Sequence, residues 1–474
     1  MRREEIHLFK ILLKQIEKKY DYVELIKVFL TPDQFTVHTD SEFESEGNVS
    51  DAASDSWITI NESGSKDRNE IKRELFHQLS KLTGQNPPWG ILTGVRPVKL
   101  TGELYQKLGS REKVSQCLKN EYLVSDEKIK LLLETWEYQQ QVLGPPPDAG
   151  VGLYIGIPFC PTRCLYCSFP SNQKGPEEIA KYLDALFTEI RYCGRRMRET
   201  GLWPESVYIG GGTPTTLSAN QLDRLLTEVE ANIDLSRTKE FTVEAGRPDT
   251  ITEEKLRVLK EHRIARISIN PQSMKKHTLE LIGRSHDPED IREAFHKAAD
   301  TGISMINADV IAGLPEETPE DYGDTLETII GLAPENITVH TLAVKRASRL
   351  IDQDPEYHYR QGMIVSEMLE NGRRMLREAG YRPYYLYRQK HMAGSFENVG
   401  YCKGDTPCIY NIRIMEEQQT IIALGAGGIS KVYFPDENRL ERIPNVTNYE
   451  VYIDRITEML ERKEENLFKE VKSC

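Results

Sequence analysis

Short apolar runs alternate with longer helical patterns between residues 151 and 351. Six of these runs predict strands, and they read "GLYIGIP", "SVYIGG", "EFTVEA", "ARISIN", "MINADVIAGLP" and "ITVHTLAV". The helical patterns between them carry start or end signals: Ser218 with Gln221, Thr252, Asp287-Pro288, Thr318-Pro319 and the terminal Gly302. Strands that alternate with helices indicate parallel pairing with right-handed crossovers.

The six strand-helix units predict an α/β fold, a partial (β/α)6 TIM-like barrel. Six units are fewer than the eight of a closed TIM barrel, so we expect the barrel to be open. A doubly wound sheet is the alternative architecture. Both architectures place the active site at the carboxyl ends of the parallel strands.

The segments on either side of this pattern predict further domains. Consecutive prolines in "GPPPDAG", residues 144–150, cannot continue a helix and indicate a linker. Residues 1–143 predict an N-terminal α+β domain, with an amphipathic helix at residues 1–22, strands at "LIKVFL", "QFTVH" and "WITI", and a helix at "RNEIKRELFHQLSKL". Residues 352–474 predict a mostly helical C-terminal cap. The polar stretch at about 40–70 predicts a long mobile loop.

The composition is that of an ordinary globular protein, since 39% of the 474 residues are hydrophobic and 28% are charged. No apolar run approaches the roughly 20 residues of a membrane span, and the N-terminus lacks the pattern of a signal peptide. We therefore expect a cytoplasmic protein. The formal net charge of −13 argues against nucleic acid as a partner, because binding to phosphate backbones requires clustered Lys and Arg.

Three of the eight cysteines lie within eight residues, at Cys160, Cys164 and Cys167, directly after the first predicted barrel strand. In a reducing cytosol such a cluster indicates metal binding or catalysis rather than disulfides. A structural zinc site needs a fourth ligand, and no second pair follows at the spacing of zinc fingers. Cys402 and Cys408 would require a long-range closure. An iron–sulfur cluster with three thiolates would keep one iron open, as catalytic metal sites do.

The spacing C-x3-C-x2-C, with the aromatic Tyr166 before the last cysteine, resembles the signature of the radical SAM enzymes. The resemblance implies that Cys160, Cys164 and Cys167 hold a [4Fe-4S] cluster, whose fourth iron is chelated by S-adenosylmethionine (SAM). It further implies that the predicted barrel is a radical SAM barrel and that the protein is an enzyme that uses a 5′-deoxyadenosyl radical.

Further motifs, in order along residues 150–435, resemble the oxygen-independent coproporphyrinogen III oxidase-like family: "YIGIPFC", "IGGGTPT", "VEAGRP", "RISINPQS", "IGRSH" and "NADVIAGLPEET". The tracts "WGILTGVRPVK" and "YRQKHMAGSFENVGY" are similar to the HemZ-type coproporphyrinogen dehydrogenases of this family. One position departs from the oxidases. They carry a further cysteine two residues after the cluster, whereas this chain has Cys167-Ser168-Phe169, and the haem-chaperone relatives have Phe there.

The resemblance implies an anaerobic enzyme of haem biosynthesis, which decarboxylates coproporphyrinogen III oxidatively to protoporphyrinogen IX. The alternatives are a haem chaperone that binds haem and a radical SAM enzyme that degrades it. The implied cofactors are the cluster and one or two SAM molecules. The implied partners are a tetrapyrrole substrate and an electron donor such as flavodoxin or ferredoxin, and we expect a monomer.

The resemblance also names site residues. Those expected to bind cofactor are Tyr154, Tyr166, Gly211, Gly212, Thr213, Glu244, Gln272, Arg284, Asp309, Ala343 and Ile429, of which Gln272, Arg284 and Asp309 fall where a second SAM would bind. The expected catalytic residues are Tyr154, Arg388 and Lys390. Cations for the substrate propionates are available at Lys345, Arg346, Arg349, Arg388, Lys390 and His391, and in the N-terminal domain at Arg96 and Lys99. For each of these cations the alternative is a solvated surface charge.

Overall fold

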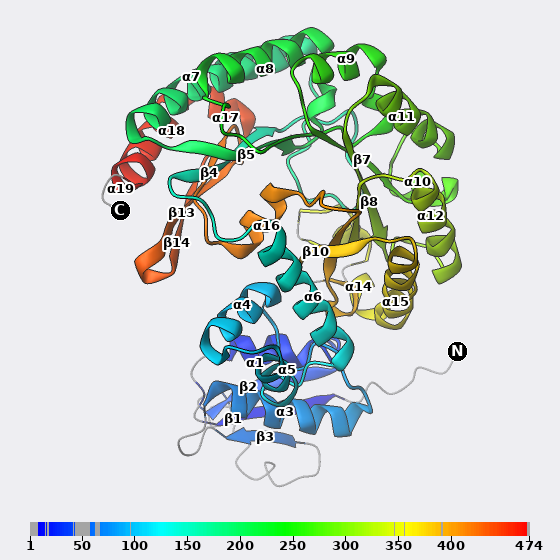
Figure 1. The fold of residues 1–474 in the computed structure, drawn as a ribbon. Coiled ribbons are helices and arrows are strands. Elements are labelled where there is room, and N and C mark those ends of the chain that lie inside the picture. Colours follow the sequence, from blue (N-terminus) through cyan, green and yellow to red (C-terminus); the bar gives the residue numbers. More distant parts are fainter. Residues whose placement is uncertain are drawn as a thin grey trace. The chain divides into compact units, whose positions relative to one another are not determined.

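The computed structural model describes residues 8–14, 16, 19–40, 42, 57–61, 67–94, 96–345, 347–354, 356–389 and 392–471. The chain divides into two compact units (Figure 1). The first contains residues 1–136 with the segments 388–390 and 394–396, and the second contains residues 137–387, 391–393 and 397–474. Most of the loop predicted at about 40–70 lies outside the described residues.

The first unit contains both helices and strands. Its elements are β1 (Phe9–Lys14), α1 (Tyr20–Ile26), β2 (Phe35–Thr39), β3 (Trp57–Asn61), α3 (Arg68–Thr83), α4 (Pro97–Leu108), α5 (Arg111–Asn120) and α6 (Asp126–Val142), the last of which continues past residue 136. β1 pairs in parallel with β2 on one side and with β3 on the other. Apolar side chains of β1, α1 and α3 form the core of this domain.

The amphipathic helix predicted at residues 1–22 is wrong where the structure describes this segment. Phe9–Lys14 forms the central strand β1, in which Ile11, Leu12 and Leu13 are all buried. A short apolar run fits a helix and a strand equally well. Here the run lies between two neighbouring strands, and this pairing decides the outcome.

The strand predicted at "LIKVFL", residues 25–30, is also wrong, because this run is the end of α1 and the turn after it. The buried side chains of the segment are Tyr22, Leu25, Ile26 and Phe29. Their spacing is that of one face of a helix, with its period of 3.6 residues. The composition of residues 25–30 is typical of a strand, but the helical spacing becomes visible only when the residues before this run are included.

The second unit contains the predicted barrel. Its strands are β4 (Gly150–Ile157), β5 (Trp203–Gly211), β6 (Glu240–Glu244), β7 (Arg266–Gln272), β8 (Met305–Ala312), β9 (Asn336–Thr341), β10 (Arg382–Tyr387), β11 (Asn398–Cys402), β12 (Ile421–Leu424), β13 (Ile429–Phe434) and β14 (Arg439–Pro444). Its helices are α7 (Pro176–Thr200), α8 (Ala219–Asn232), α9 (Glu253–Glu261), α10 (Lys276–Leu281), α11 (Pro288–Thr301), α12 (Pro319–Gly331), α13 (Leu350–Gln353), α14 (Tyr357–Arg360), α15 (Gly362–Glu378), α16 (Ile409–Glu416), α17 (Tyr449–Asp454), α18 (Ile456–Lys463) and α19 (Lys469–Val471).

The strands form a single sheet in the order β10-β11-β9-β8-β7-β6-β5-β4-β12-β13-β14. All six predicted strands are present as β4 to β9, and neighbours in the sequence pair in parallel. The order of β4 to β9 never reverses, whereas a doubly wound sheet has a point of reversal. The sheet is therefore an open barrel, as predicted.

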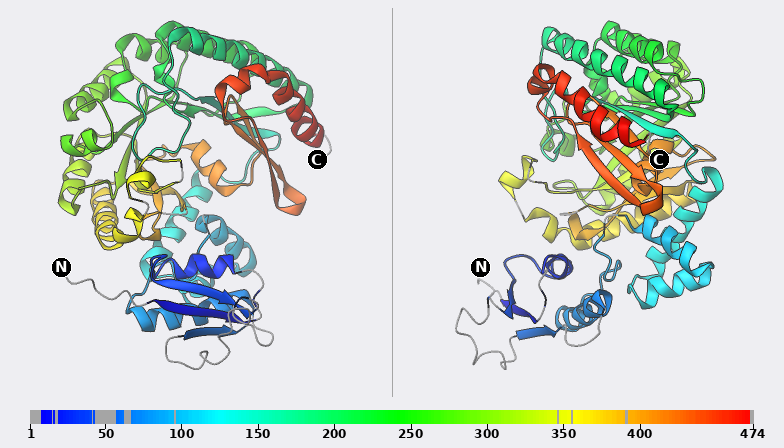
Figure 2. Two further views of the ribbon diagram at one scale, coloured as in Figure 1. Left: turned by 180° about the vertical axis from the view of Figure 1, so that it is seen from behind. Right: turned by 90° about the vertical axis from the view of Figure 1, so that its left-hand side faces the viewer.

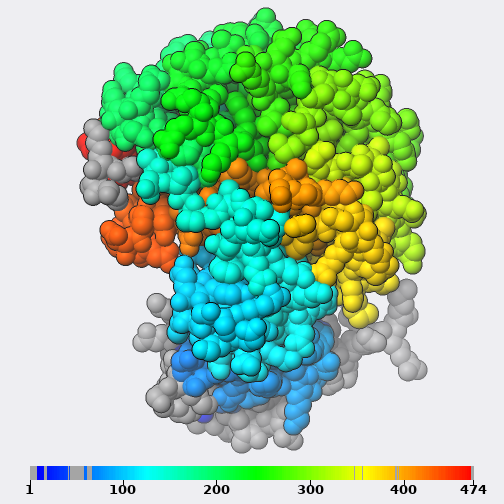
Figure 3. All heavy atoms as spheres, viewed as in Figure 1, coloured from blue at the N-terminus to red at the C-terminus, as the bar shows by residue number. Residues whose placement is uncertain are grey.

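Helices cover the outside of this curved sheet. Figures 1 and 2 show α7 to α12 along its convex face, and Figure 3 shows their side chains as a continuous outer layer, coloured green. The predicted start signals are confirmed, since Ser218, Thr252, Asp287 and Thr318 each accept a hydrogen bond from the first turn of the helix that follows. None of the helices among the described residues is long and apolar enough to cross a membrane.

Residues 352–474 were predicted to form a mostly helical cap. This part of the chain contains helices, but it also supplies five strands to the barrel sheet. β10 and β11 extend the sheet beyond β9 in antiparallel fashion. At the other edge β12 pairs in parallel with β4, and β13 and β14 follow as an antiparallel pair. The residues after 351 therefore complete both edges of the barrel.

Candidate functional site

The three clustered cysteines lie on the loop that follows β4, at the carboxyl end of the sheet. Cys160 and Cys164 are buried and Cys167 is half-buried. The loop folds back on itself, because the N–H of Cys160 donates to the carbonyl oxygen of Asn172 at 3.1 Å. The N–H of Asn172 in turn donates to the carbonyl oxygen of Pro158 at 3.0 Å. The backbone thus holds three thiols on one short, folded segment.

Two of the sulfur atoms have side-chain partners from neighbouring strands. Thr213, which follows β5, places its Oγ1 atom 3.4 Å from the Sγ atom of Cys160. Arg247, which follows β6, donates from Nη1 to the Sγ atom of Cys164 at 4.0 Å. Donors of this kind are found around thiolates that ligate metal clusters, because they stabilise the charge on sulfur.

The third sulfur atom, that of Cys167, accepts a hydrogen bond from the backbone N–H of Phe169. Burial raises the pKa of Cys160 to about 11, so a metal that binds there must displace a proton. Among the described residues, no three His, Cys, Asp or Glu side chains converge as ligands of a single metal ion.

Glycines at the end of β5 allow the strand to approach the cysteine loop closely. A Cβ atom on Gly212 would lie 2.5 Å from the carbonyl oxygen of Phe159 and 3.0 Å from the Sγ atom of Cys160. Gly211 has a φ of +113°, which a residue with a side chain rarely adopts. A Cβ there would lie 3.3 Å from the hydroxyl of Tyr154. Only glycine fits between this strand end and the loop.

Aromatic side chains and one carboxyl group line the interior of the barrel next to these glycines. The rings of Tyr154, Tyr208 and Tyr410 stack, and the centroids of the last two lie 4.6 Å apart. The hydroxyl of Tyr208 donates to Oε1 of Glu244 at 2.7 Å. Burial raises the pKa of Glu244 to about 7. A cationic ligand would therefore favour the ionised form of this carboxyl group.

We expect a Glu244→Gln variant to unfold with a weaker pH dependence than the wild type. The pKa of Glu244 in the folded state, about 7, lies above its ordinary value of 4.5. The unfolded state therefore ionises first, and the free energy of unfolding of the wild type falls as the pH rises from 4.5 through 7. Glutamine keeps an acceptor for Tyr208 and cannot ionise, so the variant should not show this fall. Its free energy of unfolding, relative to that of the wild type, should therefore increase by about 2 kcal/mol as the pH rises over this range.

Urea unfolding at about pH 5 and pH 8 measures this difference. The matched control is Glu253→Gln, because the side chain of Glu253 is 69% exposed. Equal pH dependence in the Glu244→Gln variant and the wild type would contradict the raised pKa.

Gln272 and Arg284 lie farther along the same end of the sheet. Gln272 ends β7 with a φ of +66°, and its buried Oε1 atom has no hydrogen-bond partner among the described residues. A positive φ at a residue with a long side chain is uncommon, and such strain tends to occur at functional sites. Arg284 donates to the carbonyl oxygens of Gly246 and Asn270 at 3.1 and 2.8 Å, and to the hydroxyl of Tyr166 at 3.2 Å.

Asp309 lies on β8, is half-buried and remains an anion. Asn307 donates to its Oδ1 atom at 2.7 Å, and Nε2 of His340 lies 3.6 Å from its Oδ2 atom. Burial by itself would raise the pKa of Asp309, but the hydrogen bonds from His340 and Asn307 outweigh this effect and hold the pKa below its ordinary value. Asp309 and Glu244 influence each other electrostatically, so the barrel interior carries two interacting carboxyl groups.

Other predicted residues lie at the margin of this site. Ala343 follows β9 and forms an isolated bridge with Met392. Ile429 begins β13 and is 47% exposed. Lys345 is half-buried, and burial lowers its pKa while the charge of Cys167 acts in the opposite direction. Arg349 is exposed.

The remaining predicted cations belong to the first unit or lie outside the described residues. Arg388 belongs to the first unit, where its buried guanidinium donates to the carbonyl oxygens of Leu92 and Ser395. Arg96 and Lys99, at the start of α4, belong to the same unit and are half-buried. Three predicted residues lie outside the described residues, namely Arg346, Lys390 and His391.

Cys402 and Cys408 are buried thiols that do not join the cluster loop. The Sγ atom of Cys402 donates to the hydroxyl of Tyr138 at 3.4 Å. The Sγ atom of Cys408 donates to Oε1 of Glu240 at 3.2 Å. Both sit in an apolar cluster, which is the environment of an ordinary core cysteine.

Several residues of this region were not predicted from the sequence. Arg247 and Asp249 pair next to the cysteine loop, and His340 contacts Asp309. Arg247 and Asp249 could have been predicted from the sequence, because both come shortly after the buried strand β6. Charged side chains at the carboxyl end of a barrel strand are candidates for the site. His340 could have been predicted for the same reason, because it lies near the carboxyl end of β9.

The comparisons with known proteins agree with this geometry. A family model described as "Radical SAM superfamily" matches residues 154–329. The chain is 41% identical to "Oxygen-independent coproporphyrinogen-III oxidase-like protein HemZ" of Bacillus subtilis, over 86% of this chain and 82% of that protein. It is 29% identical to "Heme chaperone HemW" of Haemophilus influenzae, over 60% of this chain and 71% of that protein.

A solved structure shows the same fold. Coproporphyrinogen III oxidase (HemN) from Escherichia coli, a radical SAM enzyme, superposes with a TM-score of 0.53 at 23% identity, over 69% of this chain and 73% of its own. Radical SAM enzymes use a [4Fe-4S] cluster and SAM, which are the cofactors predicted from the sequence. The chain therefore belongs to the radical SAM superfamily and, within it, to the HemZ-type members of the oxygen-independent coproporphyrinogen III oxidase-like family.

Proposed function

We propose that the protein is a coproporphyrinogen dehydrogenase, which converts coproporphyrinogen III to protoporphyrinogen IX without oxygen. Each of two propionate side chains would lose a hydrogen atom from its β-carbon, then carbon dioxide and one electron, which leaves a vinyl group. The proposal includes a cytoplasmic monomer that accepts an electron from flavodoxin or ferredoxin. The observation that carries it is the loop of three hydrogen-bonded thiols beside a barrel interior lined with ionisable groups.

The residues of the site fit the two cofactors. Cys160, Cys164 and Cys167 would hold the cluster, and when SAM is bound this pair of cofactors supplies a 5′-deoxyadenosyl radical. The glycines at 211 and 212 let the end of β5 lie directly against the cysteine loop, because a Cβ at either position would press on atoms of the segment 154–160. The residues proposed to contact SAM around this strand end are Tyr154, Tyr166, Thr213, Glu244, Gln272, Arg284, Asp309, Ala343 and Ile429.

The charges around this end of the barrel suit SAM, which carries a cationic amino group and an anionic carboxylate. Glu244 has a pKa of about 7 and would ionise fully next to a cation. Arg284 is a buried cation, and Gln272 has a buried oxygen with no partner among the described residues. These groups would bind the ligand, orient it and exclude water from a reactive carbon atom.

Lys345 is our candidate for binding a substrate propionate. It follows β9, is half-buried and lies within electrostatic reach of Cys167. Burial disfavours the charged form of an isolated lysine, and a carboxylate placed beside it would restore that form. Arg349 is exposed and Arg388 is bonded to backbone carbonyls of the first unit, so neither has comparable support.

A second candidate function is haem binding by a chaperone that retains the cluster. It is favoured by Phe169, which stands at the position of the additional cysteine of the oxidases and is 62% exposed. An exposed aromatic ring beside the cluster loop suits contact with a flat apolar macrocycle. The similarity to proteins named heme chaperone HemW agrees with this alternative.

The deciding experiment incubates reconstituted protein anaerobically with SAM, a reductant and coproporphyrinogen III, and identifies the tetrapyrrole product. Protoporphyrinogen IX, formed together with 5′-deoxyadenosine, supports the enzyme. Stoichiometric haem binding without porphyrin turnover supports the chaperone instead. Consumption of haem under the same conditions would indicate a haem-degrading enzyme.

A further inference from the structure

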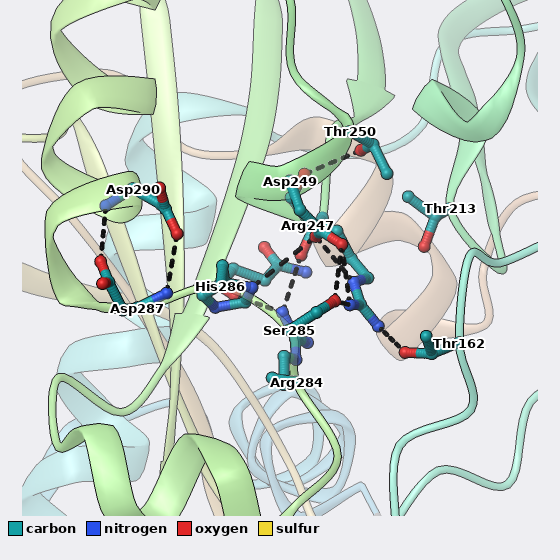
Figure 4. Close-up of polar contacts among 12 residues, drawn as sticks. Thr162, Thr213, Arg247, Asp249, Thr250, Arg284, Ser285, His286, Asp287 and Asp290 are labelled. Carbon is teal, nitrogen blue, oxygen red and sulfur yellow. Dashed lines mark hydrogen bonds and ion pairs between the residues drawn. The ribbon is translucent and has the colours of Figure 1, made fainter.

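The guanidinium group of Arg247 lies next to the cysteine loop and is only 3% exposed. Two of its nitrogens bond Asp249, with Nε at 3.0 Å from Oδ1 and Nη2 at 2.9 Å from Oδ2. Nη2 also donates to Oγ of Ser285 at 2.8 Å. Nη1 donates to Oγ1 of Thr162 at 2.6 Å and to Sγ of Cys164 at 4.0 Å. Figure 4 shows Arg247 between Asp249, Ser285 and Thr162.

These contacts use all five N–H groups that an arginine side chain offers. Two of the five reach the cysteine loop, one at Thr162 and one at the sulfur of Cys164. The other three hold the guanidinium in place through Asp249 and Ser285. A lysine or a neutral side chain could not make the same set of bonds.

The partners of Arg247 are themselves fixed by bonds to the surrounding loops. Oγ of Ser285 donates to Oδ2 of Asp249 at 3.0 Å, and Nδ1 of the buried His286 lies 3.7 Å from Oδ1 of Asp249. Thr162 donates to the carbonyl oxygen of Gly283 at 3.2 Å. The cysteine loop is therefore held against the segment that ends α10 and leads to α11.

The same segment binds the cysteine loop at a second point. The N–H of Leu165 donates to the carbonyl oxygen of Ile282 at 2.9 Å. Arg284 donates to the hydroxyl of Tyr166, between the second and third cysteines. Arg247, Asp249, Ser285 and Arg284 thus form a seat under the cysteine loop. Arg247 and Arg284 are both cations of this seat, and Arg247 reaches a sulfur atom from the side of β6.

We propose that Arg247 is a positioning residue for the iron–sulfur cluster and that it raises the reduction potential of the cluster. The argument rests on Cys164 as a cluster ligand and does not depend on the identity of the substrate. Reduction adds an electron to a centre that already carries three thiolates, and a buried cation that donates to one of these sulfurs stabilises the added charge. Asp249 opposes this effect, because it places a carboxylate on the far side of the guanidinium.

The charges of this pair lead to opposite expectations for two variants. Arg247→Met removes the cation and leaves Asp249, so the potential of the cluster should fall. Asp249→Asn removes the carboxylate and leaves the cation, so the potential should rise. If Arg247 and Asp249 only held the loop in place, both variants would loosen the loop. The potential of the cluster would then shift in the same direction in both variants, or not at all.

The measurement is a redox titration of the reconstituted full-length protein, followed by the electron paramagnetic resonance signal of the reduced cluster. Iron content and thermal unfolding are measured on the same samples. We expect Arg247→Met to change the ratio of reduced to oxidised cluster about tenfold at a fixed potential, which corresponds to a shift of about −59 mV for one electron. Arg247→Lys should lie between this variant and the wild type.

The matched control is Arg191→Met. Arg191 forms a similar two-bonded pair with Glu228 between α7 and α8, at 2.7 and 2.9 Å, away from the cysteine loop. It should leave the potential unchanged. A wild-type potential in Arg247→Met with full iron content would overturn the proposal. If this variant does not bind iron, Asp249→Asn decides, because a potential equal to or below that of the wild type would overturn the proposal equally.

The outcomes of this redox titration do not depend on whether the protein catalyses the proposed reaction. A protein that binds haem without turnover would still show the opposite shifts, because the shifts arise from the cluster and its seat. Conversely, normal conversion of coproporphyrinogen with unchanged potentials would support the proposed reaction and overturn the role of Arg247.

Discussion

A Cys167→Ala variant should lose its iron–sulfur cluster and, with it, reductive cleavage of SAM. Cys167 is the half-buried member of the three, and its sulfur accepts only a backbone N–H bond among the contacts of the described residues. Its removal should therefore leave the apo fold almost intact while it removes one of three proposed ligands. We expect iron content to fall from about four per chain to near zero, and 5′-deoxyadenosine formation to fall more than about 100-fold.

Iron analysis, the absorbance of the reconstituted protein and quantitation of 5′-deoxyadenosine measure these effects. Cys117→Ala is the matched control, because Cys117 is a partly exposed thiol on α5 in the first unit. Retention of a full cluster in Cys167→Ala, with iron equal to the control, would show that another side chain completes the ligand set. In that case the proposed assignment of the three cysteines would be wrong.

A Gly212→Ala variant should be nearly as damaging, although it changes no ligand. The new Cβ would lie 2.5 Å from the carbonyl oxygen of Phe159, 3.0 Å from that of Ile157 and 3.0 Å from the sulfur of Cys160. Two of these three atoms belong to the backbone, so the loop itself must shift. We expect a loss of about 3 kcal/mol in the free energy of unfolding and failure to assemble the cluster.

Urea unfolding of the apo protein and iron analysis after reconstitution separate the two effects of this substitution. The control is Gly175→Ala at the start of α7, where no atom lies within 4 Å of the added Cβ. Its stability should fall by no more than about 1 kcal/mol, because alanine is a poorer N-cap residue than glycine. Equal stability and equal iron content in Gly212→Ala and this control would contradict the close approach between β5 and the cysteine loop.

The barrel was predictable because its strands and helices each carry strong local signals. The apolar runs of β4 to β9 are bounded by turn residues, and Ser218, Asp287 and Thr318 mark helix starts that the structure reproduces. The first unit was less predictable. In β1, the run from Ile11 to Leu13 is compatible with both helix and strand, and only its partners β2 and β3 decide between them.

The strands of the C-terminal part were not predicted for a related reason. β12 is a run of four residues, and its pairing with β4 joins segments more than 260 residues apart in the sequence. Nothing local indicates such a partner. The same limit applies to the seat of the cysteine loop, because Arg247, Ser285 and Thr162 come from three separate loops and meet only in the folded chain.

The cysteines themselves could be predicted because all three lie on one loop, so their spacing is preserved in the sequence. The groups that modify them come from elsewhere. Thr213 and Arg247 follow different strands, and the contact between His340 and Asp309 joins two more. A sequence pattern therefore identifies the proposed ligands, whereas the electrostatic environment that acts on them requires the fold.

The completion of both sheet edges by the last part of the chain has a consequence for how the protein is made. When the ribosome has added residue 380, all six parallel strands and the cysteine loop exist, but β4 and β9 each still lack their outer neighbours, β12 and β11. Uncovered strand edges pair readily with other chains, and pairing between distant segments forms slowly. We therefore expect iron to enter only after the finished polypeptide leaves the ribosome, and nascent chains stalled before residue 421 to be the form that most needs chaperones.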